Sequence, residues 1–277
     1  MHLSSSILYV VATPIGNLDD ITTRAIKILS EVDLIAAEDT RTSAILLKHY
    51  EITTPTTSYH EHNENTKTTV LISKLKDGAH IALISDGGLP CISDPGYLLV
   101  RACRVHDIEI TVLPGASAGI SALVLSGLPA HRYVFEGFLP QKAARRNEML
   151  AKLAADERTI ILYEAPHRLT DTLQYLIKSL GNRQAAAIRE ITKKFEEVRR
   201  GSLEQLLEFY TNNLPRGEFV LVVEGQTESP CVALPVAEHV KKYIDEGMEE
   251  KEAIKRAAKE RGLPKREVYQ EYKLHRD

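Results

Sequence analysis

The fold is decided by a glycine- and proline-rich stretch, Ile84-Ser85-Asp86-Gly87-Gly88-Leu89-Pro90-Cys91-Ile92-Ser93-Asp94-Pro95-Gly96, which continues the apolar run Ile81-Ala82-Leu83-Ile84. A short apolar run that ends in glycine and proline predicts a buried strand followed by a loop. Glycines after a strand allow positive φ and a close approach of the backbone to a bound molecule. In open α/β sheets, ligands bind at the carboxyl ends of the strands. The stretch therefore predicts an α/β sheet with a ligand site in this loop.

The loop carries two carboxylates, Asp86 and Asp94, and no lysine or arginine. A phosphate-binding loop uses backbone N–H groups, commonly helped by a basic side chain, and carboxylates would repel an anion. The loop therefore favours a neutral or cationic ligand. The alternative is an ordinary strand-to-helix connection in which Asp94 caps the following helix. The loop alone leaves both interpretations open.

Strands and helices alternate on both sides of this loop. The first series predicts strands at 7–12, 34–37, 81–84 and 110–113, with helices between them. After Leu128-Pro129 a second series predicts strands at 133–138, 159–163, 186–189 and 219–223. Such alternation indicates α/β folding with a mainly parallel sheet covered on both faces. We expect two α/β domains, 1–117 and 118–229, with a ligand cleft between them.

The tail, 230–277, predicts three helices at about 236–246, 250–261 and 265–275. Gly262 ends the second helix and Pro264 can begin the third, which is compatible with a helix-turn-helix. The basic side chains of this region could meet nucleic-acid phosphates. Solvated charges on a small helical cap are the commoner explanation, and we favour it slightly.

The composition excludes several classes of protein. The 277 residues are 43% hydrophobic and 26% charged with a net charge of -3, so the chain is globular and not polybasic. Its three cysteines form no C-x-x-C pair, which argues against a disulfide framework and a zinc site. No P-loop or Rossmann glycine motif is present. Residues 1–6 lack signal-peptide features and no apolar run approaches the roughly 20 residues of a membrane span, so we expect a cytoplasmic protein.

Other motifs allow more than one interpretation. The segment His60-Glu61-His62 contains metal-ligand types, but its spacing favours a polar loop before a helix capped by Asn63, and we predict no metal. The segment Tyr163-Glu164-Ala165-Pro166-His167-Arg168 ends a strand and offers general bases and a phosphate ligand, or else a simple helix entry. Basic residues in 141–146 and 189–197 suit RNA or only solvation.

Taken together, these segments resemble the tetrapyrrole methylase superfamily, and within it the branch that methylates small-subunit ribosomal RNA. The resemblance covers essentially the whole chain in order. It rests on the segments 12–18, 37–41, 59–64, 84–96, 113–118, 135–140, 163–168 and 189–193. Two departures are Gly87, where the family is expected to have alanine, and Ala165, where it is expected to have serine. Neither removes a group assigned to the chemistry.

The resemblance implies two αβα domains, a homodimer, S-adenosylmethionine in the cleft, and methylation of the ribose 2′-hydroxyl of a cytidine in the decoding region of 16S rRNA. A sulfonium cofactor suits the acidic loop described above. By similarity, the cofactor pocket is lined by Pro14, Asp86, Gly87, Gly88, Leu89, Ile92, Ser117, Ala118, Glu164 and Thr192.

The reaction needs a base and an RNA-binding surface. The candidate catalytic bases are Glu61, Glu164 and His167, followed by His60 and Glu190. The candidate RNA contacts are Arg41, Lys142, Arg146, Arg168, Arg189 and Lys193. Two other functions stay open: methylation of a porphyrinoid ring, and a non-catalytic ribosome assembly factor that binds S-adenosylmethionine.

Overall fold

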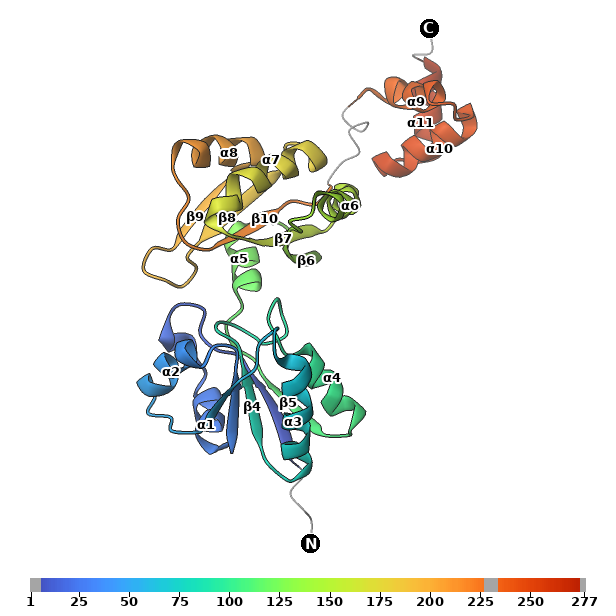
Figure 1. The fold of residues 1–277 in the computed structure, drawn as a ribbon. Coiled ribbons are helices and arrows are strands. Elements are labelled where there is room, and N and C mark those ends of the chain that lie inside the picture. Colours follow the sequence, from blue (N-terminus) through green and yellow to red (C-terminus); the bar gives the residue numbers. More distant parts are fainter. Residues whose placement is uncertain (1–5, 227–233, 275–277) are drawn as a thin grey trace.

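The N-terminal half is built on a five-stranded parallel sheet (Figure 1). The structure is a computed structural model that describes residues 6–226 and 234–274. The strand order is β3-β2-β4-β1-β5. The strands are β1 Ile7–Val11, β2 Leu34–Ala37, β3 Thr56–Ser58, β4 Ile81–Ile84 and β5 Glu109–Leu113. The central strand β4 is buried along its whole length, as its unbroken apolar run predicts.

Helices cover both faces of this sheet, because the buried side chains of each strand alternate between the two. The helices are η1 Leu18–Asp20, α1 Thr23–Glu31, α2 Thr40–His49, α3 Glu64–Lys76 and α4 Tyr97–Val105. Leu29 of α1 and Leu47 of α2 pack in one cluster with Ile35. Leu75 of α3 and Leu99 of α4 pack in another, on the opposite face. This gives three layers.

The C-terminal half holds a second sheet, in the order β6-β7-β10-β8-β9. Its strands are β6 Tyr133–Phe138, β7 Thr159–Glu164, β8 Gln184–Arg189, β9 Glu197–Ser202 and β10 Phe219–Val223. Only β6 and β7 are parallel, whereas β10 runs antiparallel to both of its neighbours and β9 antiparallel to β8. The sheet is therefore mixed, whereas every strand pair in the sheet of the first half is parallel.

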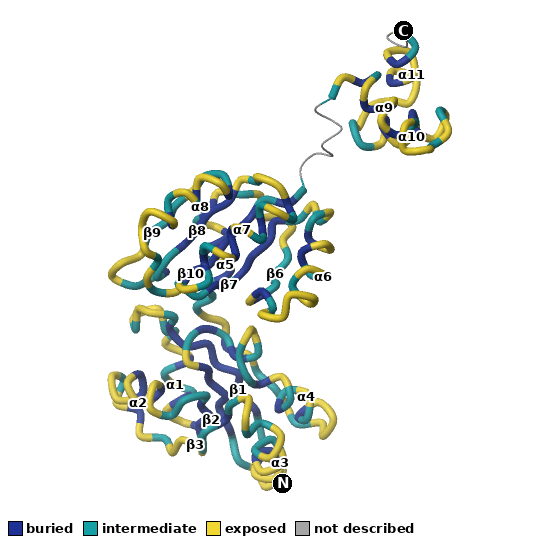
Figure 2. The backbone as a smooth tube through the Cα atoms, turned by 45° about the horizontal axis from the view of Figure 1, so that its top comes forward, coloured by how far each residue is buried: buried dark blue, intermediate teal, exposed yellow. Residues whose placement is uncertain are grey.

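This second sheet is also covered on both faces. Its helices are α5 Ala118–Ser126, α6 Ala143–Ala154, η2 Pro166–Arg168, α7 Leu169–Leu180 and α8 Leu203–Asn212. Helix α5 packs on one face through Ala122 and Leu123. Helices α6, α7 and α8 share a second cluster, on the other face. Figure 2 shows buried backbone along the central strands of both halves and mostly exposed or intermediate backbone on the helices around them. The predicted α/β class with αβα layers is confirmed.

The last described residues form a small helical unit, drawn apart from both sheets in Figure 1. Its helices are α9 Val236–Asp245, α10 Glu250–Arg261 and α11 Lys265–Leu274. They share an apolar cluster of their own, and Gly262 ends α10 in the left-handed conformation. The predicted helices are confirmed within 234–274. Residues 1–5, Cys231 and the expected helix end at 275 lie outside the described residues.

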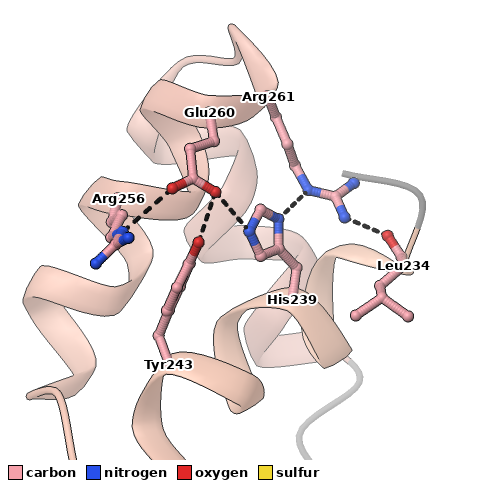
Figure 3. A network of polar contacts seen from close by, with 6 residues as sticks. All are labelled: Leu234, His239, Tyr243, Arg256, Glu260 and Arg261. Atoms are coloured by element: carbon pink, nitrogen blue, oxygen red, sulfur yellow. Dashed lines mark hydrogen bonds and ion pairs between the residues drawn. The ribbon is translucent and has the colours of Figure 1, made fainter. Parts of the chain in front are cut away.

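A buried histidine links the helices of this unit (Figure 3). The His239 side chain is fully buried, with Nε2 at 3.0 Å from Glu260 Oε2. Its Nδ1 accepts a hydrogen bond of 2.9 Å from Arg261 Nε, which leaves Nε2 as the protonated nitrogen of a neutral ring. Tyr243 Oη donates to the same Glu260 oxygen at 2.6 Å. The network ties α9 to α10.

We expect the helical unit to lose stability as the pH falls below about 6.5. Burial lowers the pKa of His239, against the opposing effect of Glu260. Between the unfolded and folded pKa values the unfolded chain binds the extra proton, so stability decreases as the pH decreases. Hydrogen exchange of the α9 and α10 amides at pH 7.5 and 5.5 measures this. A His239→Gln variant should lack the pH dependence, and equal dependence in the variant would contradict the assignment.

Within the described ranges, 6–226 and 234–274, no helix combines the length and apolar character needed to cross a membrane.

Candidate functional site

A cavity of about 840 Å³ lies between the two sheets. The N-terminal half contributes the segments after β1, β4 and β5 and the start of α2. The C-terminal half contributes the ends of β6, β7 and β8, the loop after β8, and the start of β10. Carboxyl ends of parallel strands meet at one edge of a sheet, which places the cavity at the expected edge of the first sheet.

The two loops that form the floor are tied together by their backbones. Thr13 N donates to Gly88 O at 2.9 Å and Gly88 N returns a bond to Thr13 O at 3.0 Å. Thr13 Oγ1 donates to Ser85 O at 3.1 Å. Gly88 has φ +90°, a backbone conformation that side chains rarely adopt, and it thus permits this close pairing of the β1 and β4 loops. A Cβ on Gly87 would make an ordinary contact, 3.4 Å from Pro14 O, so this position has room for alanine.

Two isoleucines in the cavity wall stand between residues with left-handed backbone. Cys91 and Ser93, which flank Ile92, have φ values of 74° and 64°. Glu190 and Thr192, which flank Ile191, have φ values of 49° and 64°. Residues other than glycine rarely adopt such angles, and they concentrate at functional sites. The first loop comes from the N-terminal half and the second from the C-terminal half, and both isoleucines line the cavity.

Carboxylates gather at the ends of β2 and β4. Asp39 N donates to Asp86 Oδ1 at 3.1 Å, and Asp86 N donates to Glu38 Oε2 at 3.3 Å. Burial raises the pKa of Glu38 and of Asp86. Burial also raises the pKa of Asp94 to about 7, with a further contribution from the charge of Glu38 and an opposing hydrogen bond from Ser85. The wall formed by Asp86 and Asp94 therefore favours a cationic ligand.

Asp94 does not cap the following helix. Helix α4 begins at Tyr97, its N-cap residue is Gly96, and no side chain bonds the cap. The cap by Asp94 that the alternative interpretation of the loop predicted is therefore wrong. Asp39, by contrast, is the N-cap of α2 and accepts from Arg41 N at 2.8 Å. Hydrogen bonds from Arg41 lower the pKa of Asp39 to about 2.

Glu164 is among the residues that line the cavity, but its carboxylate is bonded to other groups of the protein. The side chain has no exposed surface. It accepts hydrogen bonds from Thr172 Oγ1 at 2.6 Å and from Ala165 N at 2.9 Å. Arg168 Nε lies 3.4 Å from the same carboxylate. This carboxylate joins β7 to α7 and η2, and in this arrangement its oxygens face protein donors rather than a substrate.

The other candidate bases differ in their solvent exposure and in whether they line the cavity. Glu61 and His167 are exposed and are not among the cavity-lining residues. His60 is half-buried, its charge lowers the pKa of Glu38, and its Nδ1 has no hydrogen-bond partner among the described residues. Glu190 lines the cavity and accepts from Lys193 Nζ and Glu218 N, both at 3.0 Å.

The residues expected around the cofactor are brought together by the fold. Those that line the cavity are Pro14, Asp86, Gly87, Gly88, Leu89, Ile92, Ser117, Ala118 and Glu164. Thr192 lies just behind the wall, where its Oγ1 is 3.1 Å from the position that a Cβ on Gly16 would take.

Four of the six basic residues expected at RNA have carboxylate partners within the protein. Arg41 pairs with Asp39 at 2.8 Å, and Arg189 pairs with Glu197 at 3.4 Å. Lys193 bridges Glu190 and Glu218 beside the cavity. Arg168 donates to Leu139 O at 2.7 Å in addition to its contact with Glu164. Lys142 and Arg146 lie at the start of α6 and have no carboxylate partner in the described part of the chain.

Sequence reasoning assigned no role to several wall residues. They are Thr13, Ser85, Tyr163, Glu218 and Phe219. Tyr163 could have been found, because it directly precedes Glu164 at the end of β7. Glu218 could not, because it precedes a strand, and it reaches the cavity only because β10 runs antiparallel to β7.

Comparison with known proteins agrees with this architecture. The family described as Tetrapyrrole (Corrin/Porphyrin) Methylases matches residues 7–207. A Synechocystis protein named Ribosomal RNA small subunit methyltransferase I is 48% identical over 268 residues, covering 95% of this chain and 96% of the relative. A Bacillus subtilis protein of the same name is 46% identical over 275 residues, covering 97% of this chain and 94% of the relative.

Solved structures share the fold at low sequence identity. Uroporphyrin-III-C-methyltransferase from Thermus thermophilus gives a TM-score of 0.57 at 19% identity, covering 78% of this chain and 94% of that chain. Diphthine synthase gives a TM-score of 0.63 at 16% identity, and the match covers 80% of this chain and 91% of that chain. These likenesses establish the fold alone, whereas the family match spans more than half of the chain. The chain therefore belongs to the tetrapyrrole methylase family.

Proposed function

We propose that this chain is an S-adenosylmethionine-dependent methyltransferase of small-subunit ribosomal RNA. The observation that carries the proposal is the identity of 48% over 95% of the chain with a relative named for that activity. We further propose that the acceptor is the ribose 2′-hydroxyl of a cytidine in the decoding region of 16S rRNA. This finer assignment rests on the sequence resemblance described above.

The cavity suits the proposed cofactor. S-adenosylmethionine supplies a methyl group activated by a sulfonium, and it carries no phosphate. The acidic wall with Asp86 and Asp94 complements its positive charge. The loops at Gly87 and Gly88 let backbone groups approach a ligand closely. Ile92 and Ile191 offer apolar surface to the nucleoside.

Methyl transfer to a ribose hydroxyl is an in-line displacement. The hydroxyl oxygen forms a bond to the methyl carbon while the carbon–sulfur bond breaks, the sulfur becomes a neutral thioether, and the hydroxyl proton must leave. The protein has to align the hydroxyl with the methyl group and accept the proton. Among the carboxylates of the cavity wall, Asp94 has its pKa raised to about 7, which suits a general base. Glu164 and Glu190 suit the role less well, because each carboxylate already accepts two hydrogen bonds from protein donors.

Glu61, His60 and His167 act as base only if the bound RNA presents its ribose near them, because Glu61 and His167 are exposed outside the cavity. The proposal also includes a homodimer in the cytoplasm. It divides the chain into domains 1–117 and 118–229 and a helical tail, 230–277.

The direct test is transfer of labelled methyl from S-adenosylmethionine to purified small subunits that lack the modification, followed by nuclease mapping. We expect label in a single 2′-O-methylcytidine of the decoding region. Label on another nucleotide would contradict the finer assignment and keep the coarser one.

Two outcomes would favour the other functions. Methylation of a porphyrinoid substrate, with none of small subunits or rRNA, would identify a ring methyltransferase. Binding of both S-adenosylmethionine and subunits without transfer would identify a non-catalytic assembly factor.

A further inference from the structure

A second, smaller cavity lies between α6 and α7, with a volume of about 330 Å³. Arg146, Asn147 and Leu150 line it from α6. Tyr175, Lys178 and Ser179 line it from α7. No residue of this wall is acidic, so the groove presents two cations and several hydrogen-bonding groups to whatever enters it.

Arg146 is held in this groove with unused donors. Its guanidinium carbon lies 3.9 Å from the centre of the Tyr175 ring, which fixes the plane of the group. Nη1 donates to Gln141 O at 3.2 Å. Nε is buried, and Nη2, which has no hydrogen-bond partner among the described residues, is the donor that a ligand can reach. A guanidinium that is positioned but not saturated is well suited to bind a phosphate oxygen.

The charge around the groove is uncompensated within the described part of the chain. Lys142, Arg145 and Lys178 are exposed, and none of them forms an ion pair there. Lys152, further along α6, shows the ordinary arrangement, since it pairs with Glu148 at 2.8 Å. The first turn of α6 also contains no acidic residue and has no side-chain cap. Cations at a helix N-terminus are electrostatically unfavourable, so an anion bound here would relieve that repulsion.

The groove adjoins the proposed active site along the chain. Strands β6 and β7 are parallel neighbours, so their carboxyl ends share one edge of the sheet. Phe138, the last residue of β6, lines the large cavity and is 50% exposed. The chain then runs through the exposed residues Gln141 and Lys142 into α6. A nucleic-acid strand that reaches the large cavity can therefore continue over Phe138 to the groove.

We propose that the groove between α6 and α7 binds a backbone phosphate of the RNA substrate, through Arg146 and the surrounding Lys142, Arg145 and Lys178. Proteins that bind single-stranded RNA combine exposed aromatic side chains with clustered cations, because base stacking and phosphate contacts then act together. The inference rests on the proposed rRNA methyltransferase function and identifies where that substrate is held.

The test is a triple variant, Lys142→Gln, Arg145→Gln and Lys178→Gln, which leaves Arg146 on the Tyr175 ring. We expect the affinity for unmodified small subunits to fall by about 10- to 100-fold at moderate salt. The slope of log affinity against log salt should decrease by roughly 0.7–0.9 for each phosphate that the variant no longer neutralises. The affinity for S-adenosylmethionine should not change, which shows that the large cavity is intact.

The matched control removes the same charge elsewhere, by Lys27→Gln, Lys74→Gln and Lys76→Gln on α1 and α3. These lysines are exposed and line neither cavity. The control should bind subunits as the unaltered protein does. Unchanged affinity and salt slope in the first variant, or an equal loss in the control, would overturn the groove assignment alone. Failure of the unaltered protein to bind subunits or rRNA would overturn both this inference and the proposed function.

Discussion

Replacing Gly96 by alanine is expected to lower the affinity for S-adenosylmethionine at least tenfold and to reduce the free energy of unfolding by roughly 2–4 kcal/mol. Gly96 has φ +137°, a region that side chains strongly disfavour. A Cβ there would stand 2.7 Å from Cys91 Sγ and 2.8 Å from Leu83 Cδ2. Leu83 is fixed in the core of β4, so the loop has to move.

Movement of this loop would displace the wall of the cavity. Cys91 N donates to Pro95 O at 3.3 Å, so a shift of Cys91 carries the segment with Ile92 and Asp94. Calorimetric titration with S-adenosylmethionine and denaturant unfolding measure the two effects.

Gly78→Ala is the matched control. Gly78 also has positive φ, +98°, but no atom lies within 4 Å of its would-be Cβ. The Gly78→Ala change should lower the free energy of unfolding by only about 1 kcal/mol and leave the affinity for S-adenosylmethionine unchanged. Equal behaviour of the two variants would show that the packing around Gly96 has no role in the site.

Asp94→Asn is expected to weaken S-adenosylmethionine binding about 10- to 100-fold at pH 8, by removing a half-buried negative charge from the cavity wall. The same change should stabilise the empty protein. The pKa of Asp94 is raised to about 7 by burial, whereas an unfolded aspartate titrates near 3.9. As the pH rises through this window the unfolded chain releases its proton first, so the unaltered protein loses stability.

Asparagine cannot ionise, so the variant avoids this loss. We expect it to be about 1–3 kcal/mol more stable than the unaltered protein at pH 8, with a smaller difference at pH 5.5. Binding and unfolding are measured for both proteins between pH 5.5 and 8.5, and the difference between the two curves isolates Asp94 from the titration of the ligand. Asp77→Asn, at an exposed helix end, controls for the loss of one charge. If the affinity for S-adenosylmethionine changed with pH in the same way in all three proteins, the charge of Asp94 would have no role in binding.

Much of the architecture could be predicted because it follows from local patterns. The apolar run of β4 and the glycines after it predicted a buried strand followed by a loop, and that loop lines the large cavity. Two strands were missed. β3 is only three residues long, and β9 reads as a charged segment, Glu197-Val198-Arg199-Arg200-Gly201-Ser202. Strand β9 exists because it pairs along its whole length with β8, and a sequence pattern does not contain that pairing.

For the candidate site, too, the sequence predicted some features and left others undetermined. Residues that follow strands could be assigned to the cavity wall, because parallel topology brings the strand ends together. The direction of a side chain could not be assigned, because partners distant in sequence decide it. Glu164 turns its carboxylate to Thr172, and Lys193 is held between Glu190 and Glu218. Whether a charge is free or paired depends on such contacts.

The wall of the large cavity is drawn from nearly the whole length of the two sheets, from Thr13 to Val220. During synthesis, chain emerges at about 5–20 residues per second. The parallel sheet of residues 7–113 is complete after less than half of the chain has appeared, but strand β10 comes last of all the strands. The complete cavity wall therefore exists only after β10 has been added. A ligand that needs contacts from both halves can stabilise the first half only from that point onward.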